Sequence, residues 1–377
     1  MTTAISVTSR NEHGIPKYCQ IRQFIVEEEI EKKRLKAGDG IPSENELSRK
    51  FNVSKNTVVK ALNDLVKDGV LYRVQGKGTF VSQISKKATT NIGVLVYHVD
   101  NPFYSGIVKS IDERAHSKGF HTLLGNTLGD KQIERTYIRE FAGGNKIDGL
   151  ILCPVTPPTD DFIMTLKQMG MPFVFLYPQT LVEDVNCINA DDEKGAYEAT
   201  MHLVRLGHRR IAFLGSNNLG NINVAGKENG YAKALKDAAI PFDIDIVFRL
   251  RLDEIKIQDY DAIIEKFSNM TDPPTATFAI GDVPAIDFLM AVKKKGLRVP
   301  EDMAIIGYDD IEMAARPDIQ LTTVAQPIKS TGELAADMII EALKGKSATK
   351  QLVLPQRLVI RNTCGWNCQA KIRNSSK

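Results

Sequence analysis

The sequence predicts a protein of the α/β class with two parts, a small helical N-terminal domain that ends in a β-hairpin and a larger, two-lobed body built on parallel sheets. Residues 16–81 follow the order helix, helix, turn, helix, hairpin, whereas residues 91–362 alternate short apolar runs with amphipathic helices. Between them, residues 82–90 are polar and poor in apolar side chains, which is typical of a linker. A chain of 377 residues has room for both parts, because domains usually hold about 100–200 residues.

The composition argues against several classes of protein. With 43% hydrophobic and 25% charged residues, the chain resembles a globular protein. No apolar run approaches the roughly 18 residues of a membrane helix, and the polar N-terminus lacks a secretory core, so we expect a cytoplasmic protein with no membrane partner. Of the five cysteines only Cys364 and Cys368 form a near pair, so we expect reduced thiols, no metal site and no cofactor.

The charge is unevenly distributed along the chain. Residues 1–87 hold 16 basic and 10 acidic residues and carry +6, while the remainder holds 33 basic and 36 acidic residues and carries −3. A basic head on a mildly acidic body is what a polyanion-binding module attached to another domain would show. Alone this signal is weak, because modest local charge is common on solvated surfaces.

Local signals predict each element of the N-terminal domain. The predicted order is a helix over residues 17–33, a helix over 44–51, a helix over 55–69, and a hairpin of residues 70–74 and 79–81. Ser43 and Glu46 have the spacing of a capping box at the start of the second helix, and Ser54 can cap the third. Together these elements make a winged helix-turn-helix.

The third helix has the side chains that a DNA-reading helix needs at its start. These are Ser54, Lys55, Asn56 and Thr57. Hydroxyls and a helix N-terminus bind phosphate, and Lys and Asn reach base edges in the major groove. Glu44 opens the preceding helix and is close enough to contribute. The glycine-rich hairpin tip lets the backbone approach a duplex, which leaves Gln75 and Lys77 available to DNA.

This domain resembles the winged helix of the GntR family. The resemblance is carried by residues 42–48 (PSENELS), 51–54 (FNVS), 57–58, 61–62, 65 and 76–81 (GKGTFV). It implies that the DNA face consists of Glu44, Lys55, Asn56, Thr57, Gln75, Gly76 and Lys77. At Val59 the sequence departs from the family, which usually has arginine there, so we expect an altered operator preference or a weaker contact.

The body alternates strand-like runs with helices. The apolar runs are residues 92–97, 122–124, 149–153, 173–177, 211–215, 275–280 and 303–308, and the helical stretches include 107–118, 196–206, 225–239, 285–295 and 330–344. Repeated strand–helix–strand units predict parallel sheets covered on both faces. The stretch is long enough for two such lobes.

Residues at the carboxyl ends of these runs have the chemistry of a sugar site. In open α/β sheets ligands bind beyond the carboxyl ends of the strands. A sugar ring needs aromatic faces for its C–H groups and fixed polar partners for its hydroxyls. Phe103, Tyr104 and Asp282 lie at suitable places in the chain, and Lys227, at the start of another helix, could donate to hydroxyls or a carboxylate.

The body resembles the effector domain of the LacI/GalR repressors. The resemblance covers residues 91–362 and is carried by 92–96 (IGVLV), 101–104 (NPFY), 206–211 (LGHRRI), 296–302 (GLRVPED) and 306–310 (IGYDD), among others. It implies a two-lobed fold similar to periplasmic sugar-binding proteins, a homodimer, and ligand contacts at Phe103, Tyr104, Lys227 and Asp282. Gln326 is a further candidate near the lobe crossover, and we interpret residues 307–310 as a turn and hinge.

Together the two parts predict a transcription repressor that binds operator DNA and releases it on binding a small sugar. The pairing resembles bacterial arabinose repressors, so L-arabinose is the leading effector; another pentose, a hexose or a sugar phosphate is the alternative. An enzyme is the second hypothesis, but no glycine-rich phosphate loop follows a strand, and we expect no catalytic residues. A transport binding protein is the third, and the basic head argues against it.

Overall fold

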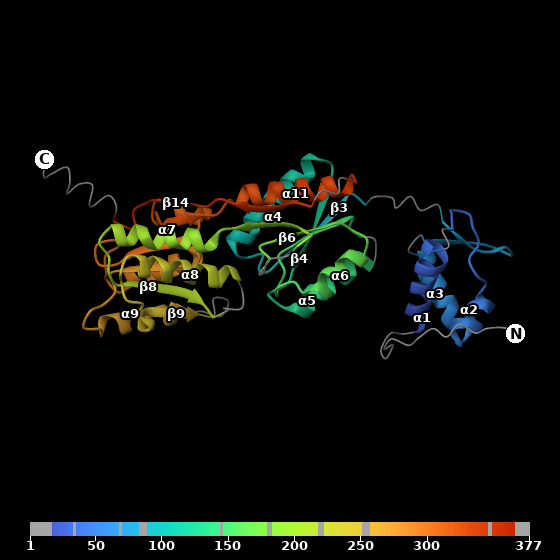
Figure 1. The fold of residues 1–377 in the computed structure, drawn as a ribbon, viewed down its shortest axis with the longest axis horizontal. Helices are drawn as coiled ribbons and strands as arrows, with labels where there is room; N and C mark the ends of the chain where they lie inside the picture. Colours follow the sequence, from blue (N-terminus) through green and yellow to red (C-terminus); the bar gives the residue numbers. More distant parts are fainter. Residues whose placement is uncertain are drawn as a thin grey trace. The chain divides into compact units, whose positions relative to one another are not determined.

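A computed structural model describes residues 17–32, 35–67, 70–82, 89–143, 146–178, 183–217, 222–250, 257–345 and 349–365. Contacts divide the chain into two compact units, residues 1–89 and residues 90–377. Figure 1 draws both units in sequence colours. Each is described here by itself.

The N-terminal unit is a helical domain with a β-hairpin. Its elements are α1 (Lys17–Phe24), a π-helical segment η1 (Ile25–Lys32), α2 (Glu44–Phe51), α3 (Lys55–Lys67), β1 (Leu71–Val74) and β2 (Gly78–Val81). The first predicted helix therefore changes from α to π geometry at Ile25. Ile21, Leu47, Val58 and Leu62 are at most 1% exposed, and they form a core between the helices and the hairpin. The wing is antiparallel, with Leu71 opposite Val81.

The predicted caps are present and fix the helix-turn-helix. The Ser43 hydroxyl accepts a hydrogen bond from the Glu46 amide, and Glu46 accepts one from the Ser43 amide at 2.7 Å, which completes the capping box. Asn52 ends α2 in the left-handed conformation, with φ of 50°. Ser54 then accepts from the amide of Thr57 at 3.3 Å and starts α3.

The first lobe of the larger unit contains a parallel six-stranded sheet in the order β13-β7-β6-β5-β3-β4. Its strands are β3 (Asn91–Val96), β4 (His121–Asn126), β5 (Gly149–Leu152), β6 (Phe173–Leu176), β7 (Asn186–Ala190) and β13 (Gln351–Leu354). The helices α5 (Lys131–Gly143) and α6 (Asp160–Gln168) cover one face, and α4 (Pro102–Ser117) and α11 (Ile328–Leu343) cover the other. Helices on both faces explain why the central strands are apolar throughout.

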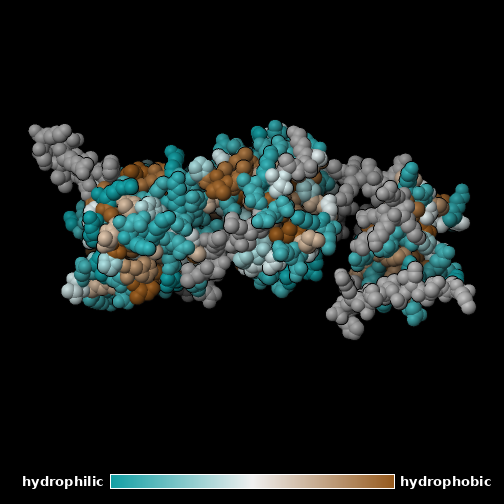
Figure 2. Space-filling model, viewed as in Figure 1, coloured by the Kyte–Doolittle hydropathy of each residue, from teal (hydrophilic) through white to brown (hydrophobic). Residues whose placement is uncertain are grey.

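The second lobe repeats this plan in the order β14-β12-β11-β10-β8-β9, parallel except for β14. Its strands are β8 (Ile211–Ser216), β9 (Val247–Leu250), β10 (Ala276–Ala279), β11 (Ala304–Asp309), β12 (Thr322–Ala325) and β14 (Arg357–Val359). The helices α7 (Asp192–Arg205) and α8 (Ile222–Asp237) cover one face, and α9 (Ile257–Ser268) and α10 (Asp282–Lys294) cover the other. Short 3-10 turns, η2 (Ile244–Ile246) and η3 (Glu312–Ala315), complete the lobe. Figure 2 shows a largely hydrophilic surface over α7, as expected of the outer side of a covering helix.

Within the described part of the chain, the backbone crosses between the lobes three times. The first crossing joins β7 to α7, the second joins β12 to α11, and the third joins β13 to β14. All three crossings leave from the carboxyl ends of strands. The predicted two-lobed parallel architecture is therefore confirmed, and the crossings lie beside the edge where ligands bind in such sheets.

Candidate functional site

The start of α3 forms a polar, exposed face on the N-terminal unit. Lys55 and Asn56 are exposed on the first turn. The Ser54 and Thr57 hydroxyls lie 2.9 Å apart and are hydrogen bonded to each other. A helix N-terminus with exposed polar side chains and hydroxyls is suited to contacts with DNA phosphates and base edges.

The wing adds a second exposed group of side chains. Gly76 and Gly78 have φ of 75° and 120°, values that glycine adopts easily, and they form the turn between β1 and β2. Gln75 and Lys77 are exposed at this turn. Glu44 joins the two parts of this face, because its carboxylate lies 3.1 Å from the Arg73 guanidinium and 3.9 Å from the Lys55 ammonium. Arg73 was not predicted from the sequence; its basic side chain on a wing strand was the available signal.

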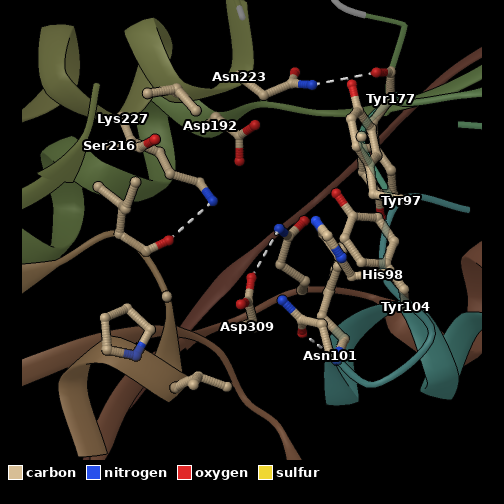
Figure 3. A pocket seen from close by; sticks show the side chains of 18 of the residues that line it. Tyr97, His98, Asn101, Tyr104, Tyr177, Asp192, Ser216, Asn223, Lys227 and Asp309 are labelled. Carbon is tan, nitrogen blue, oxygen red and sulfur yellow. Dashed lines mark hydrogen bonds between the residues drawn. The ribbon is translucent and has the colours of Figure 1, made fainter. Parts of the chain in front are cut away.

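The larger unit contains a cavity of about 670 Å³ at the carboxyl ends of the strands of both lobes. Its described lining residues are Tyr97, His98, Asn101, Phe103, Tyr104, Leu128, Gly129, Val155, Tyr177, Asp192, Ser216, Asn217, Asn223, Val224, Lys227, Ile280, Gly281, Val283, Pro284, Asp309 and Gln326. Its size suits a small organic ligand. Figure 3 shows Tyr97, Tyr104 and Tyr177 of the first lobe opposite Lys227 of the second. The Asn223 amide of the second lobe donates to the Tyr177 carbonyl at 3.2 Å.

Aromatic rings form one wall of this cavity. Asn101 caps α4 by accepting from the amide of Phe103 at 3.0 Å, which fixes the first helical turn at the cavity. Phe103 packs against Tyr104 and Tyr177 with ring centres 5.1 and 5.6 Å apart. The Tyr97 hydroxyl donates to the Pro154 carbonyl at 2.6 Å, so that ring is also held in place. Such a wall can stack on the apolar face of a sugar ring.

Charged groups lie across from the aromatic wall. Among the described lining residues these are Asp192, Lys227 and Asp309. The Lys227 ammonium donates to the Ile280 carbonyl at 3.1 Å and lies 4.1 Å from the centre of the Tyr308 ring. Gln326 reaches the same group of residues, because its amide donates to Asp309 at 3.2 Å.

Burial changes the acidity of both carboxyl groups. It raises the pKa of Asp192 above its ordinary value, while the nearby Lys227 charge acts in the opposite direction. Burial likewise raises the pKa of Asp309 to about 6, again opposed by Lys227 and by the hydrogen bond from Gln326. Asp309 therefore titrates close to neutral pH.

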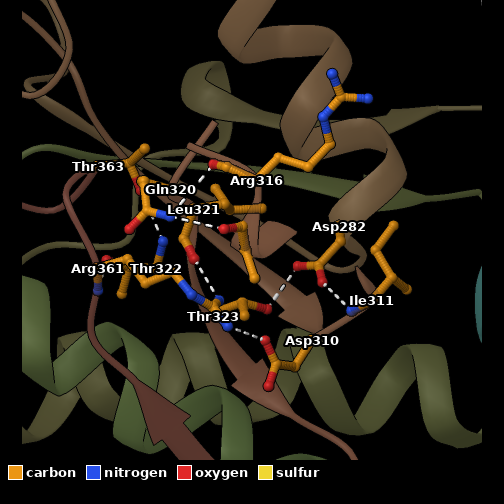
Figure 4. A network of polar contacts seen from close by, with 11 residues as sticks. Asp282, Asp310, Ile311, Arg316, Gln320, Leu321, Thr322, Thr323, Arg361 and Thr363 are labelled. Carbon is orange, nitrogen blue, oxygen red and sulfur yellow. Dashed lines mark hydrogen bonds and ion pairs between the residues drawn. The ribbon is translucent and has the colours of Figure 1, made fainter. Parts of the chain in front are cut away.

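The Asp282 carboxylate is bound by protein groups next to the cavity. Its side chain is fully buried, its neighbours Gly281 and Val283 line the cavity, and its two carboxylate oxygens face away. One oxygen accepts from the Ile311 amide at 2.9 Å and the other from the Thr323 hydroxyl at 2.5 Å, as Figure 4 shows. In this structure Asp282 braces the start of α10 against β11 and β12. It is not among the described lining residues, and its contact with a ligand stays a prediction.

Phe103, Tyr104, Lys227 and Gln326, by contrast, all line the cavity. Several of their neighbours in the cavity wall were not predicted from the sequence, namely Tyr97, Asn101, Tyr177, Asp192, Asn223 and Asp309. Four of the six lie at or just past the carboxyl end of a strand, namely Tyr97 after β3, Tyr177 after β6, Asp192 after β7 and Asp309 at the end of β11. That position was the signal that could have found them. Asp309 lies within the segment interpreted as a turn and hinge; its φ of 115° is unusual for a residue with a side chain.

Comparisons with known proteins agree with both units. Residues 18–81 match the model for bacterial regulatory proteins of the gntR family, and residues 200–364 match the periplasmic binding protein-like domain. The chain is 31% identical to an arabinose metabolism transcriptional repressor of Geobacillus stearothermophilus, over 93% of this chain and 98% of the relative. A second repressor of that name, from Halalkalibacterium halodurans, is 27% identical over 92% and 96%.

Among solved structures, a LacI family transcriptional regulator from Enterococcus faecium with bound ribose is similar to the larger unit. It has a TM-score of 0.64 and 30% identity, and the match covers 72% of this chain and 98% of that chain. No helix among the described residues is both long and apolar enough to cross a membrane.

A winged helix-turn-helix joined to a two-lobed body with a polar cavity defines a transcription regulator with a small-molecule domain. More specifically, the chain belongs to the family of bacterial transcription repressors that combine a GntR-type DNA-binding domain with a periplasmic-binding-protein-like domain. The prediction of a regulator instead of an enzyme is confirmed by these relatives.

Proposed function

We propose that this protein is a cytoplasmic, homodimeric repressor whose effector is a small unphosphorylated sugar, with L-arabinose as the leading candidate. The observation that carries the proposal is the cavity, where an aromatic wall of Phe103, Tyr104 and Tyr177 faces Asp192, Lys227 and Asp309. Carboxylates accept hydrogen bonds from sugar hydroxyls, and an ammonium group donates hydrogen bonds to the hydroxyl oxygens. The names of the two repressors that match over 93% and 92% of this chain, and the ribose bound to the Enterococcus regulator, support a pentose.

Charge favours a neutral sugar over a sugar phosphate. A phosphate adds about 1.5 to 2 negative charges near neutral pH. In the cavity a phosphate would meet two carboxyl groups, those of Asp192 and Asp309. Among the described lining residues only Lys227 is a lysine or arginine, and its ammonium already interacts with both carboxyl groups and with the Ile280 carbonyl. A neutral polyol can use all three groups without adding like charge.

The DNA-binding residues remain those of the sequence prediction. We propose that Glu44, Ser54, Lys55, Asn56, Thr57, Gln75, Gly76 and Lys77 form the operator face. Two copies of this face in a dimer would contact a palindromic operator. Sugar binding would favour the conformer with lower operator affinity, since an effector can shift only an equilibrium between states that it binds differently.

The test combines binding of sugar and binding of DNA. Operator duplexes are first selected from a randomised pool with the full-length protein. L-arabinose, D-ribose, D-glucose and arabinose 5-phosphate are then titrated while the melting temperature and operator affinity are followed. We expect L-arabinose to raise the melting temperature and to weaken operator binding by about 5–150-fold. Gln326→Ala should reduce the response, whereas the exposed Gln351→Ala serves as the matched control. A response to the phosphate alone, or to none of these compounds, would contradict the proposal.

A further inference from the structure

The three crossings between the lobes are joined by one group of hydrogen-bonded side chains. Asp192 follows the first crossing, Gln326 lies on the second, and Gln356 lies on the third. The Gln356 amide donates to Asp192 Oδ1 at 3.1 Å and to Gln326 Oε1 at 3.3 Å. One half-buried side chain therefore contacts residues of both other crossings.

The second lobe contributes a further member of this group. The Tyr308 hydroxyl on β11 lies 2.9 Å from Asp192 Oδ1 and 2.8 Å from Gln356 Oε1, so its hydrogen is shared between two acceptors. The Tyr308 ring is fully buried and carries Lys227 on its face. The group is thus anchored in the core of the lobe as well as at the crossings.

Close packing at α7 supports a defined position for Gln356. Gly195 lies on the first turn of α7, where a helix would favour alanine. A methyl group at this position would collide with Gln356 Oε1 and would lie 2.6 Å from the Tyr308 hydroxyl. The glycine therefore makes room for the Gln356 amide, and the amide has little freedom to move away from its partners.

Two members of the group also line the cavity, whereas Gln356 does not. Asp192 and Gln326 are lining residues, and Gln326 also contacts Asp309. A ligand that donates to Asp192 or Gln326 competes for the side-chain oxygens that accept from the Gln356 amide. Occupancy of the cavity is thereby linked to the hydrogen bonds that hold the crossings together.

We infer that Gln356 is a positioning residue that couples the three lobe crossings to each other and to the effector cavity. It acts through Asp192 and Gln326 without touching the effector. The inference rests on the proposed function for its link to sugar, but the coupling of the crossings is a property of the free protein. Hydrogen bonds to a buried carboxyl group are worth enough for their loss to be measured.

The experiment uses the full-length protein with Gln356→Met, which keeps the length of the side chain and removes its polar atoms. Gln351→Met, at an exposed position on β13, is the matched control. Hydrogen–deuterium exchange of the sugar-free proteins is measured in peptides that cover the three crossings. Peptides from β3 and β10 serve as internal references. We expect exchange to rise about tenfold in all three crossings of Gln356→Met, with the reference strands and the control variant unchanged.

A second measurement addresses the link to the cavity. L-arabinose affinity, measured by calorimetry, should fall about tenfold in Gln356→Met although residue 356 does not line the cavity. In Gly195→Ala the added methyl group displaces the Gln356 amide, so exchange and sugar affinity should change as in Gln356→Met. This variant replaces Gln356→Met if the latter fails to fold. Faster exchange confined to residues 354–357, or unchanged exchange, would overturn the inference. If the unaltered protein does not bind L-arabinose, the proposed effector fails while the exchange result still decides the role of Gln356.

Discussion

The side-chain amide of Gln326 donates a hydrogen bond of 3.2 Å to Asp309 on the wall of the cavity. Asp309 is half-buried, and the charges of Lys227, Asp192 and Asp282 are close enough to influence its carboxyl group. Burial raises its pKa to about 6 in spite of the favourable cation. The group that would accept a hydrogen bond from a sugar hydroxyl therefore changes charge near neutral pH.

Sugar affinity should accordingly depend on pH. The ionised carboxylate is the better acceptor, and a ligand that prefers this form binds more tightly as protons are released. We expect L-arabinose affinity to rise by about tenfold between pH 5 and pH 7.5, as measured by calorimetry. Asp309→Asn should bind weakly with a flat profile over this range, and a sloping profile in that variant would assign the dependence to another group.

The same shift predicts an effect of opposite sign on stability. A carboxyl group with a raised pKa in the folded state contributes stability that is fully present below its unfolded pKa and is lost as the pH rises through the folded value. At pH 7 the ligand-free protein therefore carries the cost of the charged Asp309. Asp309→Asn should be more stable than the unaltered protein at pH 7 by about 2 kcal/mol, and the difference should shrink towards pH 4. Denaturant unfolding at both pH values checks this.

Substitution of Asp282, unlike that of Asp309, should lower the stability of the protein. Its removal leaves the Ile311 amide and the Thr323 hydroxyl buried without their acceptor. We expect Asp282→Ala to lower the free energy of unfolding by about 2–4 kcal/mol, measured in urea, because each abandoned donor costs about 1–3 kcal/mol. Sugar affinity at a temperature where the variant is folded should change less than about threefold. A selective loss of sugar binding with normal stability would place Asp282 among the ligand contacts.

These two aspartates illustrate what the sequence could and could not predict. Asp309 ends β11 and Asp282 lies three residues after the end of β10. Because ligands bind beyond the carboxyl ends of strands, any polar residue at such a place is a candidate. The rule does not give the direction of the side chain, which depends on the φ of 115° at Asp309 and on the placement of Asp282 at the start of α10. The helix-turn-helix was predicted almost to the residue because its caps, at Ser43 and Ser54, are local signals.

Strands that depend on distant partners were harder to predict. Residues 351–354 of β13 alternate between exposed and half-buried and pair with β7, more than 150 residues earlier in the chain. Nothing in the four residues themselves identifies that partner. The Gln356 contacts follow from this pairing, since the third crossing exists only because β13 and β14 belong to different sheets.

On the DNA-binding unit, the helix and the wing should contribute differently. Asn56→Ala at the start of α3 should lower affinity for the selected operator by about 1–3 kcal/mol and relax its sequence preference, as expected of a base contact. Lys77→Ala at the tip of the wing should weaken binding to all sequences and reduce the salt slope by about 1. Anisotropy titrations of operator and scrambled duplexes at several salt concentrations separate these effects. Lys350→Ala, an exposed lysine of the larger unit, serves as control.

Val59 is the position on α3 where the resemblance to the GntR family leads us to expect an altered operator contact, and its neighbour Lys60 lies against α1. The Lys60 ammonium lies 4.3 Å from the centre of the Tyr18 ring, so this cation is held against α1. Val59 itself is partly exposed and follows the buried Val58. An arginine at position 59 can therefore extend into solvent without entering the core.

We expect Val59→Arg to strengthen operator binding by about tenfold at 0.15 M salt, because a guanidinium adds a contact to a phosphate or to guanine. Val59→Lys and Val59→Gln distinguish the two cases in the same anisotropy titrations. Equal gains for Arg and Lys, with a salt slope steeper by about 1, indicate a phosphate contact, whereas a new sequence preference with Arg alone indicates a base contact. Unchanged affinity in all three folded variants would place residue 59 outside the DNA face, and the recognition surface would then end at Thr57.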